Sequence, residues 1–277
     1  MRLDKFLSEK YPTYSRSVLV NFIKSERVQV NTKTETNPAK NVNETDDIKL
    51  NTPCETDFSK EKLPIIYEDE NVVVVNKPTG VLTHSKGALS EEFTVAEFMK
   101  RYWSGVVLTN RTGIVHRLDR ATSGVMIAAK DEMTMSFLQK QFSTRKVKKT
   151  YVAVIEGVPK EREAKIDLPL ARNPKHPSQF RVDPNGKTAI TVYKVLATNN
   201  QGESLVELKP ETGRTHQLRI HMSYLGTPIK GDPVYGKPSD RMYLHAKSLE
   251  ITTPGEQNER KVFGAPTPPE FTESFDV

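Results

Sequence analysis

The sequence predicts an α+β protein of two domains, and three observations along the chain support this fold class. Within residues 1–50, two stretches with helical spacing precede short alternating stretches. Residues 51–63 are polar and lack periodicity, as is typical of a linker. From Pro64 onward strand-like and helix-like patterns are mixed over a length that can bury a core. We therefore expect a small domain at 1–50, a linker at 51–63 and a larger domain at 64–277.

The small domain is expected to contain two helices and two strands. Apolar residues recur at helical spacing at Leu3, Phe6 and Leu7 and again at Val18, Leu19, Phe22 and Ile23. Ser15 is the expected N-cap of the second helix. Residues 28–30 and 47–50 alternate as strands. The polar faces of the two helices carry basic side chains. By charge alone, these side chains are as typical of a solvated surface as of a surface that binds a polyanion.

The larger domain begins with strand patterns and continues with both kinds of element. Apolar runs at 65–67 and 71–76 predict two buried strands that lead into a turn at 76–80. Helical spacing at 93–103 and 132–142 predicts two helices.

Its second half continues this mixture. Residues 151–155 predict a strand with Tyr151 on one face, and Asp183–Gly186 predicts a hairpin turn between strands at 180–182 and 189–195. After a strand that ends at Pro210, a helix is expected to begin near Thr215. Its apolar face is formed by Leu218, Met222 and Leu225.

Composition limits the protein class before any motif is considered. The net charge of +6 and the pI near 9.2 allow a polyanionic partner without requiring one. No apolar run reaches the length of about 18 residues that spans a membrane, and Met1–Lys5 lacks the apolar core of a signal peptide. The single cysteine, Cys54, excludes an intramolecular disulfide and suits a reducing compartment. We therefore expect a cytoplasmic protein without membrane segments and, because Cys and His lack ligand spacing, without a metal site.

The segment Val-His-Arg-Leu-Asp-Arg-Ala-Thr-Ser-Gly concentrates the candidate chemistry. Its Asp119 lies between Arg117 and Arg120, and apolar residues at 114–115 and 125–127 flank it. This pattern predicts a strand, a small-residue turn and a second strand, with Asp119 at the end of a sheet. A nearby cation favours an ionised carboxyl, so we expect an anion suited to act as a nucleophile or base. By residue types alone, a structural Asp–Arg pair explains the cluster as well.

The same segment resembles the catalytic motif of the RluA-type pseudouridine synthases, in which His-Arg-Leu-Asp is followed shortly by Thr-Ser-Gly. Residues His116–Asp119 and Thr122–Gly124 match this motif. Between them, Arg120 keeps the charge of the commoner lysine, whereas Ala121 replaces an acidic residue. No role is therefore carried over to position 121.

Further segments resemble that family in the order in which it has them. They are Asn76–Pro78 with Gly80, Lys149–Tyr151, Thr212–Arg219, Gly231–Gly236 and Leu244–Ala246. The resemblance implies a catalytic domain built on a mixed, largely antiparallel sheet with flanking helices.

The resemblance also implies roles for single residues. Asp119 would supply the reactive oxygen, Arg219 would orient it in a charge-assisted pair, and Tyr151 would pack on the uracil and take the proton from its C5 atom. Arg117 would fill the space of an extruded base, and Lys77 would shape the floor of the site. The RNA contacts expected in this domain are Arg117, His116, Arg120, Arg214, His216 and Lys77.

Residues 1–50 resemble the small αL-type RNA-binding domain first known from a small-subunit ribosomal protein. The order Arg-Leu-Asp-Lys-Phe-Leu, Ser-Arg-Ser, Ile-Lys and Val-Gln-Val-Asn carries this resemblance. In that family the face formed by the two helices binds structured RNA. The phosphate contacts it implies here are Arg2, Lys5, Arg16 and Lys24.

Conversion of uridine to pseudouridine breaks the N-glycosidic bond and rejoins the freed uracil through C5. The reaction needs no redox change, metal or cofactor, and the sequence contains neither a P-loop nor a dinucleotide fingerprint. The expected partner is structured RNA, and large-subunit ribosomal RNA is favoured because synthases with this N-terminal module mostly modify it. We expect a monomer.

Three other hypotheses compete with this one. The same enzyme acting on transfer RNA is the nearest alternative. An RNA-binding or ribosome-assembly factor without catalysis would also suit the N-terminal module, but the presence of Asp119, Tyr151 and Arg219 together argues against it. A metal-dependent phosphoesterase using His116 and Asp119 lacks a second Asp/His cluster at plausible spacing.

Overall fold

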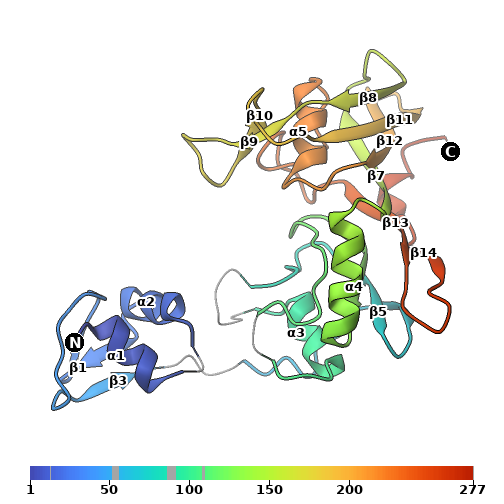
Figure 1. Cartoon of the computed structure of the whole chain (residues 1–277). Coiled ribbons are helices and arrows are strands. Elements are labelled where there is room, and N and C mark those ends of the chain that lie inside the picture. Colours follow the sequence, from blue (N-terminus) through green and yellow to red (C-terminus); the bar gives the residue numbers. More distant parts are fainter. Residues whose placement is uncertain (13, 52–55, 86–91, 108–109, 277) are drawn as a thin grey trace. The chain divides into compact units, whose positions relative to one another are not determined.

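The computed structural model describes residues 1–12, 14–51, 56–85, 92–107 and 110–276 (Figure 1). Contacts between residues divide the chain into two compact units. The smaller unit comprises Met1–Phe58 with Ser85–Glu92, and the larger comprises Ser59–His84 with Phe93–Val277. The linker predicted at 51–63 includes residues 52–55, and with them Cys54, which lie outside the described residues. Leu63, at the end of that segment, is buried in the core of the larger unit.

The smaller unit contains two helices and a three-stranded antiparallel sheet in its described residues. Its elements are α1 (Leu3–Lys10), α2 (Arg16–Lys24), β1 (Val28–Val30), β2 (Lys33–Thr34) and β3 (Ile48–Leu50). Leu3 and Leu7 of α1 and Leu19 and Ile23 of α2 have no exposed surface, which confirms the expected helix faces. Ser15 precedes α2 as predicted, but its hydroxyl lies 3.0 Å from the hydroxyl of Ser17 and does not cap the helix.

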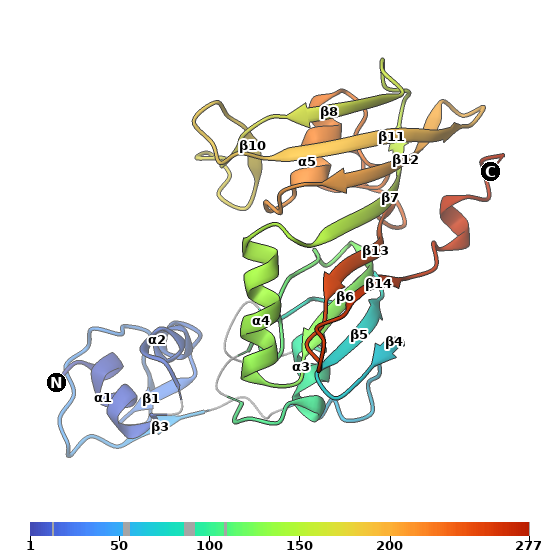
Figure 2. The ribbon, with the colours of Figure 1, turned by 45° about the vertical axis from the view of Figure 1, so that its right-hand side comes forward.

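The larger unit is built on one mixed sheet. Its described strands run in the order β4, β5, β6, β13, β7, β12, β11, β8, and β14 pairs with β13 (Figure 2). The strands are β4 (Ile65–Glu68), β5 (Val72–Lys77), β6 (Ser123–Ala129), β7 (Lys148–Glu156), β8 (Glu163–Asp167), β11 (Ile190–Thr198), β12 (Glu203–Pro210), β13 (Leu244–Thr252) and β14 (Arg260–Gly264). In the described sheet every neighbouring pair is antiparallel except β6 and β13. The predicted α+β class with a largely antiparallel sheet is confirmed.

Helices cover parts of this sheet. They are α3 (Val95–Met99), continued by the 3₁₀ turn η1 (Lys100–Tyr102), then α4 (Glu132–Ser143), α5 (Gln217–Tyr224) and the 3₁₀ turn η2 (Pro269–Phe271). Thr94 and Asp131 cap α3 and α4, because their side chains accept the backbone N–H groups of Glu97 and Thr134. These helices confirm the spacing predicted for 93–103 and 132–142.

Two of the apolar cores that pack on the described sheet meet at the candidate site. One core surrounds β5 and β6, whose residues are almost completely buried, and includes Leu138 of α4. The other joins β7, β11 and β12 to Leu218 and Met222 of α5. Tyr151 of β7 packs against both cores. The central strands therefore bring residues from both halves of the sheet to one place.

Two predicted strands differ from the structure. Ile114 and Val115 form no strand: Ile114 makes a single bridge to Ala128, directly after a turn closed by a bond from its N–H to the carbonyl of Arg111. The strand β4 exists but is not buried, since it lies at the edge of the sheet and Ile65 is 43% exposed.

The hairpin predicted at Asp183–Gly186 is also different. The turn is present, with the N–H of Gly186 donating to the carbonyl of Asp183, but β10 (Phe180–Val182) pairs with β9 (Leu170–Arg172) and not with β11. The segment after the turn folds back on β9, because the N–H of Lys187 bonds to the carbonyl of Leu170. In α5, Leu225 lies just beyond the helix end and is 40% exposed, so it is not part of the buried face.

Candidate functional site

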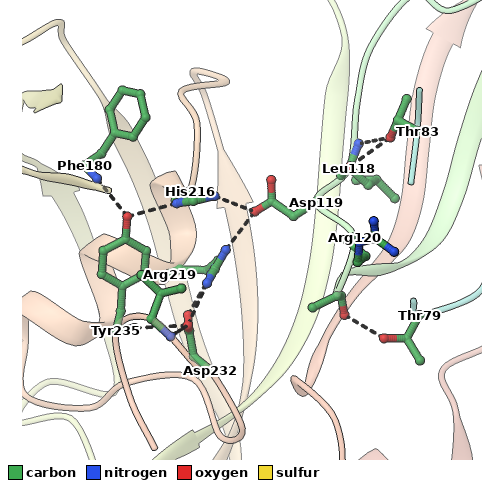
Figure 3. Close-up of polar contacts among 12 residues, drawn as sticks. Thr79, Thr83, Leu118, Asp119, Arg120, Phe180, His216, Arg219, Asp232 and Tyr235 are labelled. Carbon is green, nitrogen blue, oxygen red and sulfur yellow. Dashed lines mark hydrogen bonds and ion pairs between the residues drawn. The ribbon is translucent and has the colours of Figure 1, made fainter. Parts of the chain in front are cut away.

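The loop that carries Asp119 is fixed by hydrogen bonds to residues 77–83. The hydroxyl of Thr83 donates to the carbonyl of Leu118 (2.8 Å) and accepts the Leu118 N–H (3.2 Å). The hydroxyl of Thr79 donates to the carbonyl of Ala121 (3.0 Å; Figure 3). These bonds fix the backbone on both sides of Asp119, so its side chain is left to face α5. Ala121 takes part through its carbonyl, which any residue type supplies.

Lys77 belongs to this support and not to an RNA surface. Its side chain has no exposed area, and its ammonium donates to the carbonyls of Pro78 (2.9 Å), Val81 (2.8 Å) and Arg120 (3.2 Å). Burial lowers the pKa of Lys77 to about 7, while the nearby Asp119 carboxylate opposes that change. The expected RNA contact is therefore wrong, because all three donors of the ammonium are used inside the protein.

Arg219 of α5 joins two carboxylates. Its Nε and Nη2 atoms each lie 2.7 Å from an oxygen of Asp232, and its Nη1 atom lies 3.2 Å from Oδ2 of Asp119. Burial alone would raise the pKa of the Asp232 carboxyl, but the hydrogen bonds and charge of Arg219 outweigh burial and lower it. The expected pairing of Arg219 with Asp119 is confirmed. The bidentate pair with Asp232 holds the guanidinium in the orientation that this pairing needs.

Asp232 and Tyr235 were not singled out by sequence reasoning. Asp232 is fully buried, and its Oδ1 atom also accepts the backbone N–H groups of Val234 (2.9 Å) and Tyr235 (3.1 Å). The Tyr235 hydroxyl lies 2.9 Å from Nδ1 of His216, and Nε2 of His216 lies 3.7 Å from Oδ2 of Asp119. Through Arg219, Asp232, Tyr235 and His216 the contacts thus close into a ring that includes Asp119 (Figure 3). The available signal was the resemblance of Gly231–Gly236, which gave no role to a single residue.

Asp119 and Tyr151 line one pocket with a volume of about 410 Å³. The pocket walls also include Arg117, His116 and Lys149. Burial, and next the charge of Asp119, raise the pKa of the Tyr151 phenol. The phenol therefore keeps its proton near neutral pH, which argues against Tyr151 as the base that takes a proton from C5. Its position in the wall agrees with a packing role.

His116 forms part of the pocket wall, and its ring is committed to the fold. Its Nε2 atom accepts the N–H of Ile127 (3.1 Å), and its ring stacks on Phe142 with 4.6 Å between centroids. Burial, with a smaller contribution from Lys149, lowers the pKa of His116 to about 3. The imidazole is therefore neutral, and its role is to hold the start of the Asp119 loop against β6.

Lys149 is a pocket residue that sequence reasoning treated only as part of a motif. Its ammonium lies 3.4 Å from the carbonyl of Thr212, and no acidic side chain pairs with it among the described residues. Burial lowers its pKa to about 8. The pocket thus contains a cation that loses its proton far more easily than an ordinary lysine.

Three expected RNA contacts of the larger unit lie at positions that suit this role, which stays a prediction; they are Arg117, Arg120 and Arg214. Arg117 is exposed beside the pocket, Arg120 donates to the carbonyl of Gly80 (3.3 Å), and Arg214 donates to that of Thr188 (3.0 Å). In the smaller unit, the side chains expected to contact phosphate are exposed; they are Arg2, Lys5, Arg16 and Lys24. Buried Asp4 pairs with both Arg2 (3.0 Å) and Arg16 (2.9 Å), which places the two guanidinium groups side by side.

Neither a membrane-spanning helix nor a metal-ligand cluster is found among the described residues. No helix among them has the length and apolar character needed to cross a membrane. They also contain no group of three or more His, Cys, Asp or Glu side chains arranged to hold a metal ion.

Comparisons with known proteins agree with this geometry. The sequence profile described as RNA pseudouridylate synthase matches residues 71–224, and the S4 domain profile matches residues 1–48. An uncharacterized RNA pseudouridine synthase of Aquifex aeolicus is 38% identical over 255 residues, covering 90% of this chain and 81% of the relative. The ribosomal large subunit pseudouridine synthase D of Escherichia coli K12 is 33% identical and covers 100% of this chain and 90% of the relative.

A solved structure gives the same result for the fold. Human RNA pseudouridylate synthase domain containing 1 superposes with a TM-score of 0.64 at 29% identity, covering 78% of this chain and 88% of the human one. Its likeness extends the sequence match to the arrangement of the catalytic sheet. The chain therefore belongs to the RNA pseudouridylate synthase family, with an S4 domain at its N-terminus.

Proposed function

We propose that this RNA pseudouridine synthase acts on uridines of large-subunit ribosomal RNA, and that Asp119 supplies the carboxylate that reacts. The observation that carries the catalytic part is the pairing of Asp119 with Arg219 at 3.2 Å in the wall of a pocket. A guanidinium that donates to a carboxylate fixes the orientation of that carboxylate, which a nucleophile or base requires.

The pocket suits a uridine that has left the RNA stack. Extruding a base costs a few kcal/mol and least in a loop or bulge, where proteins also read base edges. Tyr151 provides a flat apolar wall in the same pocket as Asp119. Arg117 also lines this pocket and is exposed, and its proposed role is to occupy the space that the base leaves. The site therefore supports chemistry on an extruded nucleotide.

Two chemical routes use the same Asp119 oxygen. In one, it attacks the ribose C1′ atom and releases uracil; in the other, it removes the proton from C2′. Deuterium at C2′ separates them, since only the second route breaks that bond. A slower single-turnover rate with deuterated uridine supports proton removal, and an unchanged rate supports attack on carbon.

The ribosomal substrate rests on two observations. Relatives aligned over the whole chain are named ribosomal large subunit pseudouridine synthase D. The S4 domain presents basic side chains at its surface, two of them oriented by Asp4. Phosphate contacts of this kind position a protein on structured RNA without reading its sequence.

Expression in a host that lacks its own ribosomal synthases of this type, followed by mapping of pseudouridines in total RNA, tests the proposal. New sites in large-subunit ribosomal RNA are expected with the wild-type chain and not with Asp119→Asn. Sites confined to transfer RNA would replace the proposed substrate and keep the proposed catalyst.

The Asp119→Asn variant also has an expected behaviour in vitro. It removes the anion but keeps the size of the side chain, so isomerisation should be lost while RNA affinity stays within about threefold. Turnover by tritium release and binding by filter retention measure the two effects separately. Normal turnover by this variant would exclude Asp119 as the reacting group.

A further inference from the structure

His216 occupies a position that an RNA contact does not explain. Its side chain is only 17% exposed, and its two ring nitrogens face protein groups on opposite sides. Nδ1 lies 2.9 Å from the Tyr235 hydroxyl, and Nε2 lies 3.7 Å from Oδ2 of Asp119 (Figure 3). The ring thus stands between a tyrosine and the reactive carboxylate.

The backbone of His216 sets the direction of its ring. As the residue before α5 it has φ 56°, in the left-handed region that most residue types seldom adopt but in which histidine is enriched. In this conformation the Nε2 atom of the imidazole faces Oδ2 of Asp119.

The hydrogen bonds of Tyr235 determine which ring nitrogen carries the proton. Its hydroxyl oxygen accepts the N–H of Phe180 (2.9 Å), so the hydroxyl proton is left to be donated. Among the described residues, Nδ1 of His216 is the acceptor within reach of that proton. An Nδ1 atom that accepts a hydrogen bond requires the hydrogen of a neutral imidazole to be on Nε2, the atom that faces Asp119.

The charge state of both groups fits this arrangement. Burial lowers the pKa of His216, which favours the neutral ring, and burial raises the pKa of Tyr235, which keeps its hydroxyl protonated. The charged groups that act on His216 come from three segments: Asp119 and Arg117 on the catalytic loop, Arg219 on α5, and Asp232 after it. The carboxylates raise the pKa of His216 and the guanidinium groups lower it, so their effects oppose one another.

We propose that His216 is a positioning residue: Tyr235 fixes the imidazole as the Nε2–H tautomer, and this N–H holds Oδ2 of Asp119 together with Arg219. The inference rests on the proposed role of Asp119 and deepens it. Catalytic hydrogen bonds are often long in the free enzyme and tighten when substrate binds, so the present 3.7 Å separation is the open form of the contact. Two donors on one carboxylate oxygen leave the other oxygen free to react.

The tautomer is tested directly by nitrogen NMR on the full chain with ¹⁵N-labelled histidine. The His216 signals are identified by their loss in His216→Gln. The expected spectrum has the hydrogen on Nε2 and an unprotonated Nδ1, and Tyr235→Phe should shift it towards a mixture of tautomers. A hydrogen on Nδ1, or a spectrum that Tyr235→Phe leaves unchanged, would overturn the proposed lock.

The effect on Asp119 is tested by a matched pair of variants. His216→Gln keeps an N–H donor and His216→Leu lacks one, while both bear the same backbone cost at φ 56°. The single-turnover rate at saturating RNA should fall about tenfold further in His216→Leu than in His216→Gln, because a hydrogen bond to a charged group is lost. RNA affinity and thermal stability should agree between the two variants.

The other outcomes also decide the matter. Equal rates in the two variants, or a difference found only in RNA affinity, would overturn the positioning role. If the wild-type chain isomerises no uridine in any RNA, the proposed function fails, and the tautomer measurement still decides whether Tyr235 sets the state of His216.

Discussion

Asp119 shares one guanidinium with a second carboxylate that is far more deeply buried. Arg219 gives two hydrogen bonds to Asp232 and one, longer, to Asp119. Asp232 cannot be reached by a substrate, so its charge fixes Arg219, whereas Asp119 keeps 21% of its side chain exposed. Asp232 and Asp119 carry the same chemical group, and their different roles follow from their different burial.

Lys149 should give RNA capture a pH dependence. Burial lowers its pKa to about 8, so the ammonium is present below that pH and lost above it. An RNA phosphate is attracted to the cation only, and kcat/KM reports groups of the free enzyme. We therefore expect kcat/KM to fall as the pH rises through about 8.

Lys149→Arg is the control, because an arginine stays charged in this range. It should remove the fall at about pH 8, and Lys149→Gln should have a low kcat/KM at every pH. Rates on one RNA at constant ionic strength measure this. A fall near pH 8 that persists in Lys149→Arg would assign it to another group.

At the scale of elements, the site depends on the parallel contact between β6 and β13. Gly124 pairs with Ala246 where the two strands meet, and it has φ 117°. A Cβ atom at Gly124 would lie 2.3 Å from the carbonyl oxygen of Ala246 and 2.5 Å from its nitrogen. The close approach of these backbones joins the half of the sheet next to Asp119 to the half that carries Tyr151.

Gly124→Ala should therefore separate the two strands, lower the melting temperature strongly and reduce turnover. A loss of about 3 kcal/mol or more in the free energy of unfolding is expected, since backbone atoms must move. Gly202→Ala is the matched control, because Gly202 also has a positive φ (76°) but no heavy atom within 4 Å of the added Cβ. It should cost about 1 to 2 kcal/mol, the cost of the left-handed conformation for a residue with a Cβ atom. If both variants lost the same free energy of unfolding, glycine would be required at position 124 by its positive φ and not by the close approach of the Ala246 backbone.

At the scale of the whole molecule, the S4 domain and the catalytic unit should contribute to RNA binding in different ways. The catalytic unit contains the pocket and the reacting groups, and the S4 domain contributes exposed basic side chains. Binding through phosphates is sensitive to salt, whereas recognition of an extruded base is much less so.

Deletion of residues 1–50 should weaken binding to a large structured RNA and reduce its salt dependence. Each lost phosphate contact lowers the slope of log affinity against log salt by about 0.7 to 0.9, so the four expected contacts together lower it by about 3. Titrations at several salt concentrations measure the slope. Replacing Arg2, Lys5, Arg16 and Lys24 with glutamine should reproduce most of the effect, and an unchanged slope in both variants would exclude these contacts.

The sequence by itself determined the local elements and the chemistry of the motif residues. Helical spacing located α1, α2 and α4, because an apolar stripe every three to four residues is a local property. The resemblance of short motifs predicted that Asp119, Tyr151 and Arg219 belong to one site. In the structure, Asp119 and Arg219, which are 100 residues apart in the chain, are in contact.

Only the tertiary structure decided burial and partners. It placed β4 at an exposed edge, paired β10 with β9, buried the ammonium of Lys77 and kept the phenol of Tyr151 protonated. It also connected Asp232 and Tyr235 to Asp119. The physical reason is the same in each case: the environment of a polar group depends on residues far along the chain, and a pattern of neighbours in sequence does not contain them.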